Sequence, residues 1–228
     1  MSSFRTLIFN TMVKFMMNEA VLGVVSGLLS ALLWGLNPLL IKAITDVEPN
    51  PIIISGLRQF WSGIIAIILI ISLNLFAPIE YVLLITLSGV LGPVIGDIGF
   101  TIALRELGSG LGTLISYQYV IVTQLLAVMI LGEPYSIGKL LATISSMTAL
   151  APILSRDYLR EKKFLGVMGA LIACLGWASA TIINNKVVQT SVDPLCFTIT
   201  RTVILLLVFG APVIVISELR RNEKSFHQ

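Results

Sequence analysis

The chain has 228 residues, of which 56% are hydrophobic and only 12% are charged, and its mean hydropathy is +0.96. Soluble globular proteins carry about 25% charged residues, and one core cannot hide this much apolar surface, so the composition argues against a soluble fold and excludes intrinsic disorder. The net charge of +3 is small, and the basic residues form no stripe with interleaved aromatics, so nothing supports nucleic-acid binding.

Apolar stretches long enough to cross a membrane follow one another along most of the chain. Residues 1–18 are too mixed to form such a stretch and lack a signal-peptide cleavage pattern, so we treat them as an N-terminal extension. A helix of about 20 apolar residues crosses a bilayer core, and the stretches do not alternate as barrel strands do. The sequence therefore predicts an all-α integral membrane protein with about seven transmembrane helices. The predicted helices are 21–43, 52–74, 82–104, 110–131, 136–155, 164–187 and 195–217.

The segments between these helices are short and are rich in proline and glycine, as in Pro49 to Pro51 and Gly132 to Pro134. The exception is the long charged loop at 155–163. Lysine and arginine are more frequent on the side of the C-terminus, which predicts an external N-terminus and a cytoplasmic polar tail at 218–228. We therefore expect a multi-pass protein of the cell membrane, surrounded by the lipid bilayer.

An internal repeat becomes visible when the chain is shifted by 143 residues against itself. At this offset Trp34 aligns with Trp177, and Arg58 aligns with Arg201. The repeat unit holds five predicted helices, and an odd number inverts the second copy in the membrane. We therefore expect a first repeat at 19–156 and a partial second repeat of two helices at 163–217. The remaining helices are either truncated or supplied by a partner, as a homodimer or a half-transporter.

Several of these segments resemble a known family. The segment at 32–42 resembles the first helix of the EamA family of the drug/metabolite transporter superfamily, and it reads Leu-Leu-Trp-Gly-Leu-Asn-Pro-Leu-Leu-Ile-Lys. The segment at 125–133, which ends in Gly-Glu, resembles the fourth helix of that family. The resemblance implies two inverted five-helix repeats that export or exchange small metabolites by alternating access. It also implies that both termini are cytoplasmic, which differs from the charge count. Two family features are absent, namely three helices and the basic loop expected at 74–81.

Charged and polar residues inside the predicted helices are the candidates for a binding site, since a charge in hydrocarbon costs at least about 2.5–3.5 kcal/mol. Counting along the helices places Arg58 and Asp97 at similar depth. Arg58 would hold an anionic or carbonyl group of a small polar metabolite, and Asp97 would be its counter-ion or a proton carrier. In the alternative, Arg58 snorkels to the interface and Asp97 merely pairs with it. The polar residues that share one helix face, such as Thr113, Tyr117 and Gln124, would then only hydrogen-bond helices together. The predicted substrate-binding residues are Trp34, Asn37, Arg58, Asp97, Tyr117 and Gln124.

Other residues bear on packing and on the class of protein. Gly89, Gly92, Gly96 and Gly99 share one helix face and predict close helix packing. The chain's one histidine is His227, in the tail, and there is no ATP motif, so we expect no enzyme, no cofactor and no metal site. Transport would then be gradient-driven or an exchange. The alternative function is a non-transporting or partner-dependent membrane subunit, or a fragment of a ten-helix transporter.

Overall fold

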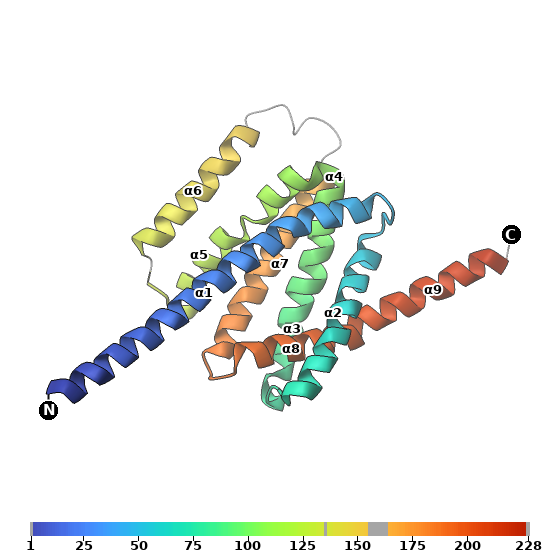
Figure 1. Ribbon diagram of the computed structural model, residues 1–228. Helices are drawn as coiled ribbons and strands as arrows, with labels where there is room; N and C mark the ends of the chain where they lie inside the picture. The colour runs from blue at the N-terminus through green and yellow to red at the C-terminus, as the bar shows by residue number, and fades with distance from the viewer. Residues whose placement is uncertain (1, 135, 155–163, 227–228) are drawn as a thin grey trace. The chain divides into compact units, whose positions relative to one another are not determined.

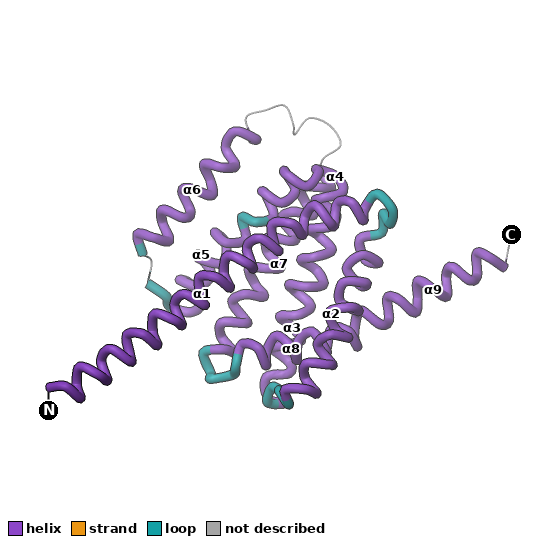
Figure 2. The backbone as a smooth tube through the Cα atoms, viewed as in Figure 1, coloured by secondary structure: helices purple, strands orange, loops and turns teal. Residues whose placement is uncertain are grey.

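The computed structural model describes residues 2–134, 136–154 and 164–226, and the regular elements in these ranges are helical, without a strand (Figures 1 and 2). The chain divides into two units, residues 1–40 and 41–228, which we describe separately. The first unit is most of α1 (Ser2–Thr45), whose last residues belong to the second unit. The prediction of an all-α fold is confirmed for the described residues.

The second unit is built from eight further α-helices in the described ranges. A 3-10 turn, η1 (Ile79–Tyr81), precedes α3, and two π-helical segments, η2 (Val90–Gly96) and η4 (Leu206–Gly210), join α3 to α4 and α8 to α9. The helices are α2 (Pro51–Leu73), α3 (Val82–Gly89), α4 (Asp97–Ser116), α5 (Tyr119–Leu131), α6 (Ile137–Leu154), α7 (Phe164–Val188), α8 (Pro194–Leu205) and α9 (Ala211–Phe226).

Five apolar helical stretches among the described residues are long enough to cross a membrane. Large apolar side chains point outward from them, and Ile71, Leu83 and Met129 are 72%, 78% and 80% exposed. Such a surface is unfavourable in water but suits lipid. α6, which holds the predicted fifth span, is 18 residues long and is not one of the five. The stretches are Val21–Thr45, Pro51–Leu73, Ile79–Leu131, Phe164–Val188 and Pro194–Arg220.

The 53-residue stretch Ile79–Leu131 folds back on itself at Gly108. As one straight helix it would be about 80 Å long, against about 30 Å for the bilayer core. Gly108 has φ +83°, a conformation that favours glycine. The ring of Phe100, which precedes this turn, stacks on the ring of Tyr117, which follows it, with the centroids 5.9 Å apart. The stretch is therefore two arms, and the predicted spans 82–104 and 110–131 lie in different arms.

The starts of α2 and α8 are built alike. Asn50 accepts a hydrogen bond from the backbone of Ile52, and Asp193 accepts from the backbone of Leu195 and Cys196. In each case a proline follows at the first helical position, where its missing N–H costs nothing. The two caps are 143 residues apart, which is the offset of the sequence repeat.

The π-helical segment η2 interrupts the helical ladder immediately before Asp97. Pro93 lies inside it and lacks the N–H that an α-helical turn requires. The side chain of Gln59, which is buried, donates to the carbonyl oxygen of Pro93 at 3.3 Å. The interruption therefore bonds to α2 as well as setting the direction in which α4 leaves.

α7 packs antiparallel against the α3–η2–α4 arm through small residues. A Cβ added to Gly99 would lie 2.6 Å from the carbonyl oxygen of Gly169, and one added to Gly176 would lie 2.5 Å from that of Leu91. Gly96 meets the Trp177 ring in the same way. The predicted role of the glycine face at 89–99 in close packing is confirmed.

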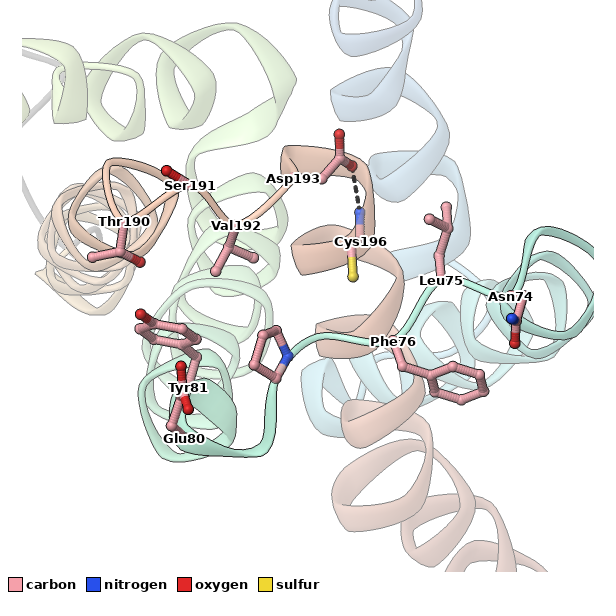
Figure 3. Close-up of a pocket in the computed structure, with 11 residues that line it drawn as sticks. Asn74, Leu75, Phe76, Glu80, Tyr81, Thr190, Ser191, Val192, Asp193 and Cys196 are labelled. Carbon is pink, nitrogen blue, oxygen red and sulfur yellow. Dashed lines mark hydrogen bonds between the residues drawn. The ribbon is translucent and has the colours of Figure 1, made fainter.

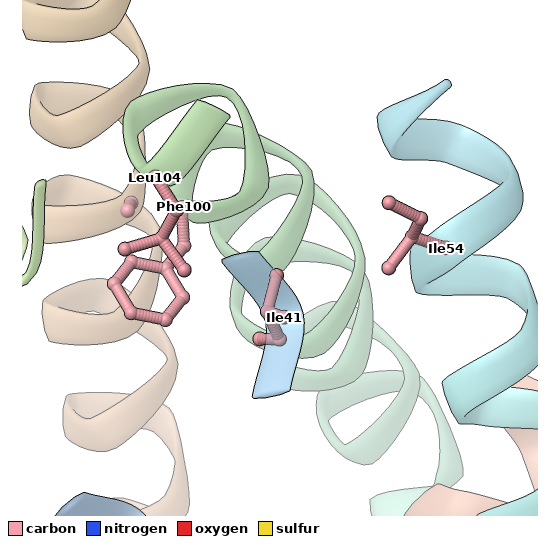
Figure 4. Packing of buried hydrophobic residues seen from close by; sticks show 5 residues of the cluster. Ile41, Ile54, Phe100 and Leu104 are labelled. Atoms are coloured by element: carbon pink, nitrogen blue, oxygen red, sulfur yellow. The ribbon is translucent and has the colours of Figure 1, made fainter. Parts of the chain in front are cut away.

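α2 packs antiparallel against the α8–η4–α9 helix. Gly63 of α2 faces Leu206, and Gly56, seven residues earlier on α2, faces Val213, which lies seven residues after Leu206. The two helices therefore run in opposite directions. Apolar clusters fill the remaining space. One of them joins the end of α1 to α2, α4 and α7 (Figure 4) and contains Ile41, Ile54, Phe100, Leu104 and Ala173.

Candidate functional site

An ion pair lies in the interior of the second unit, between α2 and α4. Nη1 of Arg58 lies 2.9 Å from Oδ2 of Asp97, and the Asp97 side chain is 8% exposed while that of Arg58 is 26% exposed. Nη1 is buried and has no hydrogen-bond partner within the described residues. The contact is therefore ionic, and it leaves hydrogen-bonding capacity on the guanidinium.

Trp177 of α7 holds the second oxygen of the same carboxylate. Its indole Nε1 donates to Oδ1 of Asp97 at 3.0 Å. Gly96, immediately before Asp97, brings the Trp177 ring this close, because any side chain there would strike the ring. Asp97 is thus held by a cation from α2 and a neutral donor from α7.

An aromatic cluster surrounds Trp177 on the side of α5. The centroid of the Trp177 ring lies 4.9 Å from that of Phe100, 5.9 Å from that of Tyr117 and 5.6 Å from that of Tyr119. These rings pack edge to face beside a buried carboxylate, and aromatic rings can serve a small ligand as stacking or cation–π partners. The ion pair and these rings together form the candidate site.

The structure brings some of the predicted site residues together and separates others. Arg58 and Asp97 meet, as the depth count predicts, and Tyr117 joins them through Trp177. The amide oxygen of Gln124 instead accepts from Thr143 of α6 at 2.9 Å. Trp34 and Asn37 belong to the first unit, so their convergence on the site stays a prediction.

A second polar cluster lies between α3, α7 and α8. The Asn184 amide, oriented so that both its ends are satisfied, accepts from Nη1 of Arg201 at 3.2 Å and donates to the Ser88 hydroxyl and the Ala180 carbonyl. Nη1 of Arg201 also lies 3.5 Å from the Ser88 hydroxyl oxygen. The repeat aligned Arg201 with Arg58, but the predicted site left it out.

A pocket of about 360 Å³ opens at the end of the unit where α2 turns into α3 and α7 turns into α8 (Figure 3). Glu80 and Tyr81 line it from one turn, and Thr190 and Asp193 line it from the other. None of the six predicted site residues lines this pocket. The carboxylate of Asp193 is engaged in capping α8.

Together these features define a class of protein, namely a helical membrane protein with several apolar spans and a buried ion pair between two of them. A family model, the EamA-like transporter family, matches residues 21–155. The chain therefore belongs to this family, whose members are transporters rather than enzymes. No curated protein and no solved structure matches the chain.

Proposed function

We propose that this protein is a secondary transporter that moves a small polar metabolite across the cell membrane by alternating access. The observation that carries the proposal is the buried Arg58–Asp97 ion pair, which is completed by Trp177. A buried ion pair is weak as a device for stability, since apolar residues of similar volume often serve as well. Ionisable residues inside spans typically mark substrate or ion pathways.

In this proposal the chain has seven spans, and its last two helices repeat the first two in inverted orientation. The α2–α8 interface supports the inversion. Gly63 and Leu206 face each other and are separated by the repeat offset of 143. The offset also relates position 56 to position 199 and position 70 to position 213. When it is applied to the facing pair Gly56 and Val213, it gives the pair Ile199 and Ile70, which belong to one apolar cluster. A two-fold axis that passes between Gly63 and Leu206 would make the same exchange.

Roles for the site residues follow from their chemistry. Arg58 binds an anionic or carbonyl group through guanidinium N–H groups, such as those of Nη1, that make no hydrogen bond to Asp97. Asp97 is the counter-ion, or the carrier of a coupled proton, and Trp177 and Tyr117 pack against the apolar part of the substrate. The π-helical segment η2, with Pro93 inside it, supplies a point where α4 can change direction relative to α3.

The test is uptake into liposomes that contain the purified full chain, with labelled amino acids, monocarboxylates and nucleobases as probes. We expect one probe class to be taken up, with Arg58→Ala and Asp97→Asn each reducing uptake at least tenfold. The matched controls are Arg220→Ala and Asp46→Asn, which change exposed residues of the same types. Unchanged uptake kinetics in both site variants, with normal membrane insertion, would contradict the proposal.

A further inference from the structure

The charges inside the described spans do not balance. Away from the helix ends and the Gly108 turn, these spans hold Arg58, Asp97 and Arg201. Arg58 and Asp97 form an ion pair, while none of the ion pairs within the described ranges includes Arg201. Arginine stays protonated in proteins. The interior of these spans therefore carries one uncompensated positive charge, which is costly in a membrane.

Neutral groups hold the Arg201 guanidinium without neutralising it. Nη1 contacts Asn184 and Ser88, and the guanidinium carbon lies 5.5 Å from the centre of the Phe197 ring. Nε is buried and has no hydrogen-bond partner within the described residues. One side of the guanidinium is thus fixed in place, while Nε, on the other side, remains without an acceptor.

From this arrangement we propose that Arg201, with Ser88 and Asn184, binds a singly charged anionic group, the carboxylate of an organic acid. The proposal rests on the proposed transport function, and it names the substrate class. A guanidinium matches a carboxylate with two parallel hydrogen bonds. One negative charge would balance the interior, whereas a doubly charged phosphate would leave it negative.

The pocket at the α2–α3 and α7–α8 turns supplies an approach to this site. The turn that leads into α3, the turn that follows α7 and the first turn of α8 line the pocket, with Tyr81 and Cys196 among the lining residues. Arg201 lies five residues beyond Cys196, and Ser88 lies seven beyond Tyr81, which puts both about 8–10 Å deeper. Buried apolar side chains, among them Ile85 and Phe197, pack together in this region. An anion would reach Arg201 when these side chains move aside.

The first experiment measures binding to the full chain purified in detergent. The probes are acetate, lactate and benzoate, each compared with its neutral amide and with inorganic phosphate, and thermal unfolding is the readout. We expect a carboxylate to raise Tm when its amide does not, and Arg201→Gln to increase the Kd of that carboxylate at least tenfold. Arg220→Gln, at an exposed arginine of α9, should leave the Kd unchanged.

The unliganded variant separates a binding role from a structural one. If Arg201 awaits an anion, Arg201→Gln removes an uncompensated charge, so its Tm without ligand should equal or exceed that of the unmodified protein. A lower Tm together with unchanged carboxylate binding would overturn the proposal. A second result would also overturn the proposal. If no soluble carboxylate raises Tm, and phosphatidylglycerol raises Tm more than phosphatidylcholine does in a way that requires Arg201, the bound anion is a lipid headgroup.

The two proposals fail in different ways. Carboxylate binding that Arg58→Gln abolishes and Arg201→Gln preserves overturns the Arg201 site and leaves the transport function standing. Binding that depends on Arg201, in a protein that takes up none of the labelled amino acids, monocarboxylates and nucleobases into liposomes, supports the site and contradicts transport.

Discussion

At the scale of single residues, the Arg58–Asp97 pair can be tested by removing one charge and then both. Asp97→Leu alone leaves Arg58 without its counter-ion, and we expect a loss of roughly 3 kcal/mol in the free energy of unfolding. The partial exposure of Arg58 keeps the loss toward the lower end of the range for buried pairs. Unfolding of the purified variants by denaturant in detergent provides the measurement.

The double variant Arg58→Met, Asp97→Leu is the matched control for this prediction. It replaces the pair with apolar side chains, and we expect it to recover most of the stability lost by Asp97→Leu. A double variant no more stable than the single variant would mean that the destabilisation comes from lost packing rather than from an unpaired charge.

Trp177 gives a second prediction at this scale. Trp177→Phe keeps an aromatic ring against Phe100 and Tyr117 but removes the donor to Oδ1 of Asp97. Hydrogen bonds to charged groups contribute about 1.5–3 kcal/mol, so we expect a destabilisation of that size. Combining Trp177→Phe with Asp97→Leu should add little to the effect of Asp97→Leu, and full additivity in this cycle would argue against the bond.

The sequence indicated the two charges of the site, whereas the predicted site residues do not include Trp177, which completes it. Counting from helix ends puts Arg58 and Asp97 at one depth because helical rise is constant. It does not say which residue of a third helix faces them. The alignment of Trp177 with Trp34 at the repeat offset was the available signal, and the close approach at Gly96 determines the contact.

At the scale of elements, the antiparallel contact of α4 and α7 depends on glycine. Gly99→Ala places a methyl group 2.6 Å from the backbone oxygen of Gly169, so we expect a destabilisation of about 1–3 kcal/mol. Gly110→Ala meets no atom within 4 Å and should be neutral or slightly stabilising in its helix. Thermal unfolding of the two variants compares them, and equal Tm values would contradict the packing described here.

The turns between elements were less predictable than the elements themselves. The apolar pattern predicted that a helix ends before residue 110, and the chain turns there at Gly108, which has a positive φ. A proline inside a helix favours a kink, but Pro93 specifies neither the π-helical register of η2 nor the hydrogen bond that its carbonyl accepts from Gln59 of another helix. Such long-range bonds leave no periodic mark in a sequence.

At the scale of the whole molecule, the seven-span arrangement predicts the sides on which the turns lie. One span separates Asp46 from Glu80, and an even number separates Glu80 from Thr190. With Cys174 and Cys196 replaced by serine, single cysteines at 80 and 190 should therefore react with an impermeant thiol reagent from one side of the membrane. A cysteine at 46 should react from the other side, and labelling of 46 and 80 from the same side would contradict the arrangement.

Composition and apolar length sufficed to predict a helical membrane protein, because lipid demands apolar helices of bilayer length. The family followed from local motifs in the first repeat, such as the one at 32–42, and the match to residues 21–155 confirms it. Which polar residues converge depends on how helices pack. For that reason the sequence did not indicate that the amide oxygen of Gln124 accepts a hydrogen bond from Thr143 of α6.

Uptake by a variant in which the ion pair is reversed, Arg58→Asp with Asp97→Arg, distinguishes a pair that binds substrate from a pair that only joins two helices. The reversal keeps two opposite charges between α2 and α4 but removes the acceptor of the Trp177 N–H. A pair that only holds the helices together would therefore lose stability on reversal, while the protein that still inserts would keep its rate of uptake. We predict a protein that inserts into liposomes and transports at less than a tenth of the normal rate, because the cation no longer lies where the substrate's anionic or carbonyl group binds. Uptake at the normal rate by the inserted variant would contradict the account.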